Sequence, residues 1–320
     1  MAAPMELYCW KGDWGLPSVD VDCLAVLTYA RFSGAPLKVH KITNPWRSPS
    51  GSLPALTTED SGVLSQTQAI ITHLRKQKYN ADYDLSARQG ADTLAFVSLL
   101  EEKLLPALIH TFWIDAKNYV EHTRKWYAET IPFPFNFFLP NQMHRQHVTR
   151  LQLIRGDAWI EDEEELEKEL YREAQECLSL LSHRLGTQKF FFGDSPASLD
   201  AYIFSHLALL LKAKLPSSKL QQHLKTLDNL CNYCISILSI YFAWDGGVSQ
   251  PTSPRTAPAD APDGEEEPHK RRNQILSVAA GLVAMIGYAF LSGIISIHAG
   301  SSGSAVIGRL DMEEEEEEET

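Results

Sequence analysis

The chain of 320 residues lacks the features that mark several large classes of protein. Its five cysteines form an odd, sparse set, which fits free thiols in a reducing compartment. The N-terminus has neither the basic start and apolar run of a secretory signal nor the Arg- and Ser-rich pattern of a matrix-targeting presequence. Apolar residues make up 44% and charged residues 22%, which excludes a mainly disordered, collagen-like or coiled-coil chain.

Basic residues are also scarce, and the charge is unevenly distributed. Of 41 acidic and 29 basic residues, 13 acidic and five basic ones follow residue 245. Residues 1–245 therefore hold 28 acidic and 24 basic side chains and are close to neutral. No basic stripe is evident, which argues against a nucleic-acid partner.

Only one long hydrophobic run is evident, from Ile275 to Ile297, with the sequence ILSVAAGLVAMIGYAFLSGIISI and no charged residue. As an α-helix these 23 residues would span about 34 Å, enough to cross a hydrocarbon core of about 30 Å. We therefore predict a single transmembrane helix, with a buried core helix as the alternative. Small residues recur along it, among them Gly281, Gly287 and Gly293, which leaves lateral association with another helix open.

The flanks of this run support the same interpretation. Lys270, Arg271 and Arg272 precede it, and basic flanks favour the cytosolic side of a membrane, which places most of the chain in the cytosol. Residues 246–272 hold five prolines and read as a disordered linker with a basic end.

The acidic tail, residues 298–320, follows the run. Because the run lies so near the C-terminus, we expect insertion after translation, as in a tail-anchored protein. The run of acidic residues from Glu313 to Glu319 is typical of a solvated tail.

Residues 1–80 alternate between strand and helix patterns. We predict strands over 6–10, 37–42, 53–56 and 62–64, and helices over 19–32 and 66–76. This order is typical of an α/β thioredoxin-like domain. That fold keeps a cis proline at the position where Pro54 lies, and an ordinary trans proline is the alternative.

Residues 86–245 read as an all-helical domain. We predict helices over 92–113, 117–129, 163–185, 198–211 and 219–242, and Pro106 should kink or split the first. The segment 132–140 reads PFPFNFFLP. We interpret it as an aromatic plug between helices, because exposed Phe side chains are costly in water; a surface patch for a partner is the alternative.

Several sequence blocks resemble known families. The segment 190–204, FFFGDSPASLDAYIF, resembles the FxxGDxPSxAD segment of the glutathione-transferase fold. Longer blocks, such as ITNPWRSPSGSLPAL and KYNADYDLSARQGADTLAF, resemble the metaxins over essentially the whole chain. The resemblance implies a transferase-like pair of domains, followed by the disordered linker and the transmembrane helix.

The metaxin resemblance also implies a place and a role. It implies a mitochondrial outer-membrane protein, with the bulk of the chain facing the cytosol, that acts without a cofactor in protein import and in the sorting and assembly of β-barrel proteins. The implied partners are metaxin 2, the barrel subunit of the assembly machinery, the cristae-organising complex and mitochondrial precursor proteins. A structural tether to the cristae-organising complex is an alternative.

The rival hypothesis is a membrane-tethered, glutathione-dependent transferase. Such an enzyme needs a thiol-activating hydroxyl or cysteine at the end of the first strand, where Tyr8 and Cys9 lie. The resemblance places the glutathione-holding pair on Gln66 and Thr67, near Pro54. A loop separates Cys9 from the following helix, so no helix N-terminus would stabilise its thiolate, and we interpret Cys9 as buried and inert.

Two further pairs carry weaker signals. Cys231 and Cys234 lie on an apolar helix without a second ligand pair at zinc spacing, so we interpret them as core residues. His144 and His147 lie in a polar stretch, which we interpret as a solvated helix face. No metal site is predicted.

Overall fold

The computed structural model describes residues 5–58, 62–156 and 163–243. The predicted transmembrane helix, its basic flank at 270–272, the linker and the acidic tail lie outside the described residues. Within the described part of the chain, no helix is both long and apolar enough to cross a membrane.

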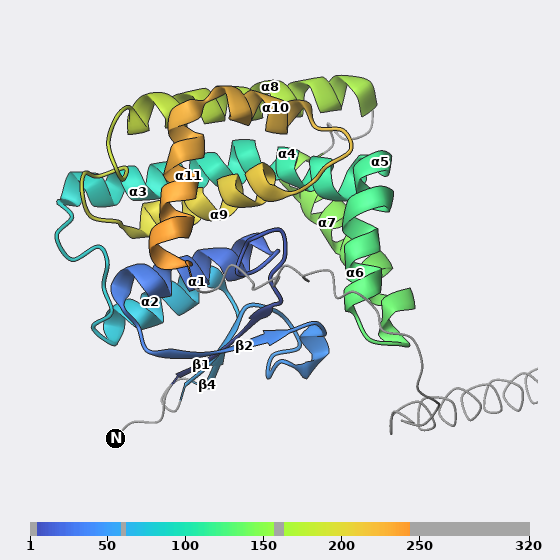
Figure 1. The fold of residues 1–320 in the computed structure, drawn as a ribbon, viewed down its shortest axis with the longest axis horizontal. Coiled ribbons are helices and arrows are strands. Elements are labelled where there is room, and N and C mark those ends of the chain that lie inside the picture. Colours follow the sequence, from blue (N-terminus) through green and yellow to red (C-terminus); the bar gives the residue numbers. More distant parts are fainter. Residues whose placement is uncertain (1–4, 59–61, 157–162, 244–320) are drawn as a thin grey trace, which may run out of the picture. The chain divides into compact units, whose positions relative to one another are not determined.

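A four-stranded sheet forms the base of the N-terminal part (Figure 1). Its strands lie in the order β2 (Leu37–Ile42), β1 (Met5–Trp10), β3 (Ala55–Thr58) and β4 (Gly62–Leu64). Strand β1 pairs parallel to β2 and antiparallel to β3, and β3 pairs antiparallel to β4. The predicted thioredoxin-like topology is confirmed, and the Leu53–Pro54 peptide bond is cis as expected.

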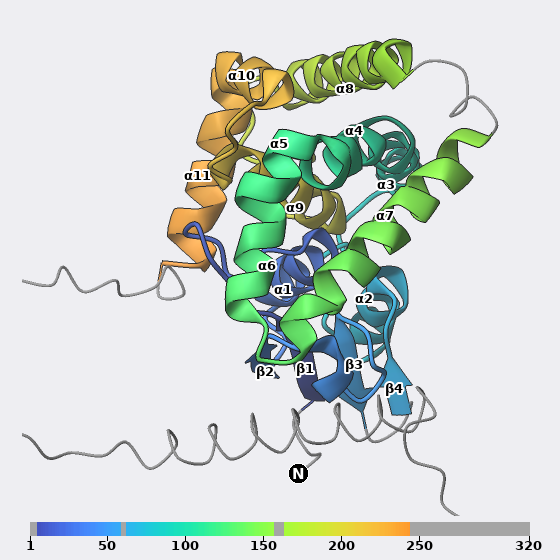
Figure 2. The same ribbon diagram turned by 90° about the vertical axis from the view of Figure 1, so that its right-hand side faces the viewer.

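Two helices, α1 (Val21–Ser33) and α2 (Thr67–Lys76), lie between this sheet and the helical part (Figures 1 and 2). Helix α1 begins where the Asp20 carboxylate accepts a hydrogen bond from the backbone N–H of Cys23 at 2.8 Å. It ends at Gly34, whose φ of 67° is the left-handed conformation that glycine adopts without strain. The buried strand residues Leu7 and Cys9 face the same side as these helices.

The predicted helix over 92–113 is a succession of tighter and wider turns. It consists of α3 (Ala87–Leu99), the π-helical η2 (Leu100–Leu104), α4 (Leu105–Ile109) and the π-helical η3 (His110–Ile114). Pro106 lies in the first turn of α4, so the expected disturbance is confirmed. Proline donates no backbone hydrogen bond, and a wide turn before it accommodates the missing bond.

The remaining helices follow the sequence prediction with two exceptions: the helix over 139–155 was not predicted, and one predicted helix is two. They are α5 (Ala116–Asn118), η4 (Tyr119–Arg124), α6 (Lys125–Thr130), α7 (Leu139–Arg155), α8 (Glu163–Leu185), α9 (Ser198–Lys212), α10 (Lys219–Thr226) and α11 (Asp228–Tyr241). The single helix predicted over 219–242 was wrong. The chain breaks at Leu227, with φ −97° and ψ 78°, after the Thr226 hydroxyl donates to the His223 carbonyl at 2.7 Å.

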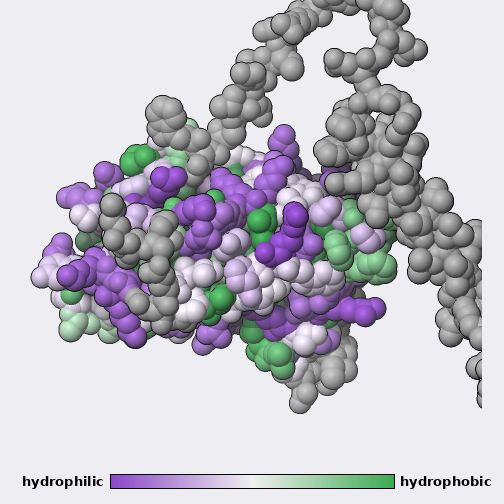
Figure 3. Space-filling model, turned by 90° about the horizontal axis from the view of Figure 1, so that it is seen from below, coloured by the Kyte–Doolittle hydropathy of each residue, from purple (hydrophilic) through white to green (hydrophobic). Residues whose placement is uncertain are grey.

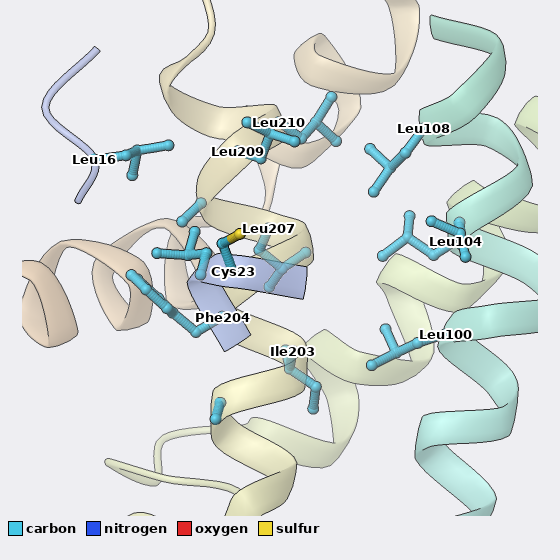
Figure 4. Close-up of a cluster of buried hydrophobic side chains, with 14 of the residues drawn as sticks. Leu16, Cys23, Leu100, Leu104, Leu108, Ile203, Phe204, Leu207, Leu209 and Leu210 are labelled. Atoms are coloured by element: carbon cyan, nitrogen blue, oxygen red, sulfur yellow. The ribbon is translucent and has the colours of Figure 1, made fainter. Parts of the chain in front are cut away.

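Helix α9 lies at the centre of the molecule. It packs against α1 of the N-terminal part and is buried along nearly its whole length. Figure 4 shows Phe204 and Leu207 of α9 close to Cys23 of α1, with Leu104 and Leu108 on the opposite side of the same cluster of buried side chains. One continuous core therefore joins the sheet-bearing part to the helical part.

The segment that resembles the transferase fold holds the start of α9 in place. The buried Asp200 carboxylate accepts hydrogen bonds from the backbone N–H of Phe191 at 3.0 Å and of Ala197 at 2.9 Å. It also accepts one from the Tyr233 hydroxyl at 3.1 Å. Phe190 and Phe191 are buried as a result.

The interpretation of 132–140 as a plug between helices was wrong. The side chains of Phe133, Phe137 and Phe138 are 66%, 63% and 64% exposed. The segment, which includes the short helix η5 (Phe135–Phe137), joins α6 to α7 at the end of a hairpin beside the sheet (Figure 2). Among the described residues, Phe135 alone has an aromatic neighbour outside the segment: Trp46, in the short helix η1 (Pro45–Arg47).

Candidate functional site

A cleft lies where the starts of α1 and α2 meet the helices of the C-terminal part. Its empty volume is about 1070 Å³, including solvent at its mouth. Most of the wall is apolar and comes from η2, α4, η3 and α9: Leu100, Leu105, Leu108, Ile109, Phe112 and Leu209. A mostly apolar cleft with a few polar groups is the usual form of a small-molecule site.

Acidic side chains line the side of the cleft formed by α1. Burial, reinforced by the nearby carboxylate of Asp22, raises the pKa of Asp20 to about 6. Asp22 accepts a hydrogen bond from the Thr67 hydroxyl at 3.0 Å, and its other carboxylate oxygen lies 4.0 Å from a guanidinium nitrogen of Arg150. Glu101 supplies a third carboxyl group. Among the lining residues, acidic groups therefore outnumber the single arginine.

The histidines of the cleft do not offset this negative charge. His147 stacks on Trp113 with ring centroids 4.1 Å apart, and burial lowers its pKa to about 3. Burial also lowers the pKa of His206, whose Nδ1 lies 2.8 Å from the Tyr202 carbonyl. Both rings are neutral at pH 7, and the His147 ring packs as an aromatic group.

The interpretation of His144 and His147 as a solvated face is corrected by the same geometry. His144 lies 4.6 Å from the ring of Tyr119, measured between centroids, and His147 covers Trp113. This face of α7 packs back onto η3 and η4, so the pair belongs to the aromatic packing of the C-terminal part.

One polar atom in the cleft wall has no partner. The hydroxyl of Thr123 is buried and makes no hydrogen bond within the described residues. An unpaired buried hydroxyl costs free energy unless water or a ligand supplies the missing bond. Thr123 therefore adds a hydrogen-bonding point to an otherwise apolar stretch of the wall.

The residues to which the transferase hypothesis assigns the activation of the glutathione thiol lie outside this cleft. Cys9 is fully buried in the core and does not line the cleft. Burial, followed by a hydrogen bond with Cys9, raises the pKa of the neighbouring Cys23 thiol well above its usual range. Neither thiol is thus placed as an activated nucleophile.

Tyr8 points to the opposite face of the sheet. Its ring stacks on His40 at a centroid distance of 4.7 Å, and its hydroxyl donates to Glu6 at 3.1 Å. Desolvation and this hydrogen bond raise the pKa of Tyr8, which is the reverse of activation. The alternation of side chains along β1 explains the placement, since Cys9 and Tyr8 are consecutive.

The two predicted glutathione-holding residues lie in different surroundings. Gln66 is exposed at the N-cap of α2 and makes no capping hydrogen bond through its side chain. Thr67 lines the cleft, but its hydroxyl is committed to Asp22. Of Cys9, Pro54, Gln66 and Thr67, only Thr67 lines the cleft.

Sequence reasoning missed the residues that give the cleft its charge. The pattern DVDC at 20–23 indicates a helix N-cap, which places Asp20 and Asp22 in one turn. Arg150 and Thr123 lie on segments far along the chain, and no local pattern marks them. Their convergence depends on how α7 and η4 pack against α1.

The Cys231–Cys234 pair behaves as a core element. Cys234 is fully buried, and burial raises its pKa. The Cys231 thiol lies 3.3 Å from the Leu224 carbonyl oxygen. Across the described residues, no three His, Cys, Asp or Glu side chains gather in a way that could hold a metal ion.

Comparisons with known proteins give consistent results. A family described as "Outer mitochondrial membrane transport complex protein" matches residues 23–144, and "Glutathione S-transferase, C-terminal domain" matches residues 174–237. Metaxin-1 from Macaca fascicularis is 71% identical over 320 residues, which is all of both chains. Metaxin-1 from Homo sapiens is 71% identical over all of this chain and 68% of its own length.

More distant relatives and solved structures extend the pattern. Metaxin-3 from Xenopus laevis is 54% identical over 241 residues, 75% of this chain and 78% of its own. The crystal structure of glutathione transferase GSTFuA3 from Phanerochaete chrysosporium superposes with a TM-score of 0.52 at 14% identity, over 75% of this chain and 98% of that one. At that identity the likeness concerns the fold alone.

Proposed function

The chain belongs to the metaxin family, and on this premise we propose that it is a non-enzymatic subunit of the machinery that imports mitochondrial proteins and assembles β-barrel proteins in the outer membrane. The observation that carries the proposal is the identity of 71% over the full length of a metaxin-1. The match of residues 23–144 to an outer-membrane transport family supports the same role.

The proposed attachment to the membrane uses the C-terminal quarter of the chain. Residues 275–297 form the transmembrane helix, the basic flank at 270–272 stays on the cytosolic side, and residues 246–272 act as the linker. The domains at 1–80 and 86–245 then face the cytosol, and the acidic tail at 298–320 crosses the membrane.

Fractionation of mitochondria tests this attachment. After washing with alkaline carbonate, the full chain should remain in the membrane pellet, and added protease should remove the domains at 1–245 from intact mitochondria. A chain that ends at residue 270 should appear in the soluble fraction. Retention of the shortened chain in the pellet, or release of the full chain by carbonate, would contradict the proposal.

The proposed chemistry is recognition of other proteins. Metaxin 2, the barrel subunit of the assembly machinery, the cristae-organising complex and incoming precursor proteins are the proposed partners. Chemical cross-linking in isolated mitochondria, read by mass spectrometry, should give cross-links from lysines of residues 1–245 to the first two. Recovery of cross-links to soluble cytosolic proteins alone would contradict this assignment.

The charge of the cleft argues against the glutathione-dependent enzyme. Glutathione carries net negative charge at neutral pH, whereas Asp20, Asp22 and Glu101 line this cleft against one arginine. The Thr67 hydroxyl that would hold a ligand carboxylate already donates to Asp22. A second anion beside Asp22 would be repelled.

Calorimetric titration with glutathione separates the two hypotheses. The full chain in detergent should give no binding heat with micromolar-range affinity. The rival predicts such binding, abolished by Gln66→Ala together with Thr67→Ala. Gln68→Ala, which alters a neighbouring residue of the same cleft, is the matched control.

A further inference from the structure

The end of the α6–α7 hairpin presents aromatic side chains to solvent. We define the aromatic tip as Trp46, Phe133, Phe137 and Phe138; the Trp46 side chain is 49% exposed, and the phenylalanines are more so. We propose that the aromatic tip docks on the surface of an anionic phospholipid bilayer, with its rings in the interfacial layer and nearby cations on the headgroups.

The aromatic tip combines two segments that are distant in the sequence and meet in the fold. Trp46 of η1 meets Phe135 of η5 edge to face, with ring centroids 5.1 Å apart. Phe133 and Phe137 pair in the same manner at 6.0 Å. Through the first contact η1 adjoins the end of the α6–α7 hairpin, whose backbone is seen in Figures 1 and 2. On the face seen in Figure 3, apolar side chains gather at separate places among hydrophilic ones.

The two segments that form the tip are rich in positive charge, although the exposed Glu129 lies just before the second of them. Residues 37–58 and 130–156 contain no Asp or Glu, although the chain has a net charge of −12. They contain six basic residues: Lys38, Lys41, Arg47, Arg145, Arg150 and Arg155. This positive surface was not evident in the sequence, because its two halves are separated by about a quarter of the chain.

Half of these cations are available to an external anion. Lys38 pairs with Glu6, Arg150 with Asp22 and Arg155 with Glu173. The structure records no ion pair for the exposed Lys41, Arg47 and Arg145 among the described residues. Each lysine or arginine near an anionic membrane surface adds to the attraction between the two.

The size of the tip favours a lipid surface over a protein partner. An aromatic side chain offers about 150–250 Å² in all, so four partly exposed rings offer roughly 500 Å². A stable protein–protein interface buries about 800 Å² on each partner. A bilayer needs no complementary pocket, and aromatic rings with basic neighbours are the groups that its interface accepts.

The proposed anchor brings the tip within reach of a bilayer. This step rests on the proposed function: residues 246–272, the proposed linker of 27 residues, would have an end-to-end distance of about 30 Å. The folded part would then sample the membrane surface continually. Weak insertion of a few rings would suffice to fix its orientation.

Fluorescence of the full chain in vesicles tests the proposal. Phe137→Cys, labelled with an environment-sensitive fluorophore in a Cys231→Ser background, should show blue-shifted emission and a several-fold rise in intensity in phosphatidylcholine–phosphatidylserine vesicles compared with phosphatidylcholine alone. The matched control is Leu153→Cys. Leu153 is 80% exposed and lies near the C-terminal end of α7, away from the tip. The label at 153 should keep an aqueous spectrum.

Reversing the charge of the three exposed basic residues is the second part of this test. Lys41→Glu, Arg47→Glu and Arg145→Glu together should abolish the shift at position 137, while circular dichroism stays unchanged because all three side chains are exposed. The proposal is overturned if the label at 137 stays aqueous in both lipid mixtures. It is equally overturned if the shift depends on protein concentration and not on lipid, since that indicates a second copy.

The same vesicles separate this proposal from the anchor. If the chain stays with vesicles after an alkaline wash while position 137 remains aqueous, the anchor stands and the tip proposal fails. If the wash releases the chain, the anchor fails. The label at 137 then reports docking of added anionic vesicles by its shift, or refutes docking by its absence.

Discussion

Two phenylalanine-rich segments of this molecule look alike in sequence and have opposite environments. The segment at 189–194 reads KFFFGD, and the segment at 132–138 reads PFPFNFF. Phe190 and Phe191 of the first are buried in the helical core, whereas Phe133, Phe137 and Phe138 of the second are exposed.

The difference lies in what each segment is tied to. The Asp200 carboxylate at the start of α9 accepts a hydrogen bond from the backbone N–H of Phe191. This bond fixes the first segment against α9, which is buried along nearly its whole length. The second segment has no such bond to the core, and the side-chain oxygen of its Asn136 is buried without a partner among the described residues. Hydrophobic composition alone therefore does not decide burial in an irregular segment.

The largest effect should come from truncating a ring in the buried segment. Phe191→Ala should lower the free energy of unfolding by about 3–5 kcal/mol, because it removes a packed ring and leaves a cavity. Phe137→Ala at the tip should change it by less than about 0.5 kcal/mol. Denaturant titration of the detergent-solubilised chain measures both, and similar losses in the two variants would break the comparison.

A smaller loss of stability should follow from removing the Asp200 carboxylate that holds the buried segment. Asp200→Ala leaves two buried backbone N–H groups without their acceptor and removes one of two acceptors of the Tyr233 hydroxyl, and should cost about 2–4 kcal/mol. Asp194→Ala is the control, since Asp194 is exposed in the same segment. If both substitutions leave the denaturation midpoint unchanged, the carboxylate does not hold the segment.

The smallest effect concerns His147, midway along the helix that leads from the tip. Its pKa is about 3 in the folded chain against an ordinary value of 6.5, so the folded state binds fewer protons than the unfolded state between these values. Stability is therefore lost as the pH falls through this window, by about 1–2 kcal/mol at pH 5.

The variant His147→Phe keeps the stack on Trp113 and removes the titrating group. Its unfolding free energy, measured at pH 7 and pH 5, should fall less on acidification than that of the unaltered chain. Arg150 and His144, the neighbours that also lower the pKa of His147, remain in place as an internal reference. An identical acid loss in both proteins would show that His147 is accessible to protons.

Regular elements were predictable because their periodicity is local. The inward positions of α8, including Leu170, Leu178 and Leu181, are buried as the 3.6-residue repeat predicts. The break at Leu227 was not predictable, because an apolar pattern continued across it, and the hydrogen bonds that end α10, from the Thr226 hydroxyl and the Leu227 N–H, leave no mark in the sequence.

The cleft was predictable only in part. The resemblance to the transferase fold placed a glutathione-holding pair on Gln66 and Thr67, and of the two only Thr67 lines the cleft. Its chemistry was not predictable, because Asp22, Thr123 and Arg150 come from three distant segments and meet only in the folded chain. The positive surface beside the aromatic tip was missed for the same reason.

The central claim is that this family member serves by recognition at a membrane and not by cleft chemistry. The most direct test is assembly of a β-barrel precursor in mitochondria that lack the chain, after re-expression of variants. The account predicts that Cys9→Ala with Thr67→Val restores assembly and that a chain ending at residue 270 does not. Full restoration by the shortened chain, together with failure of the cleft variant, would contradict it.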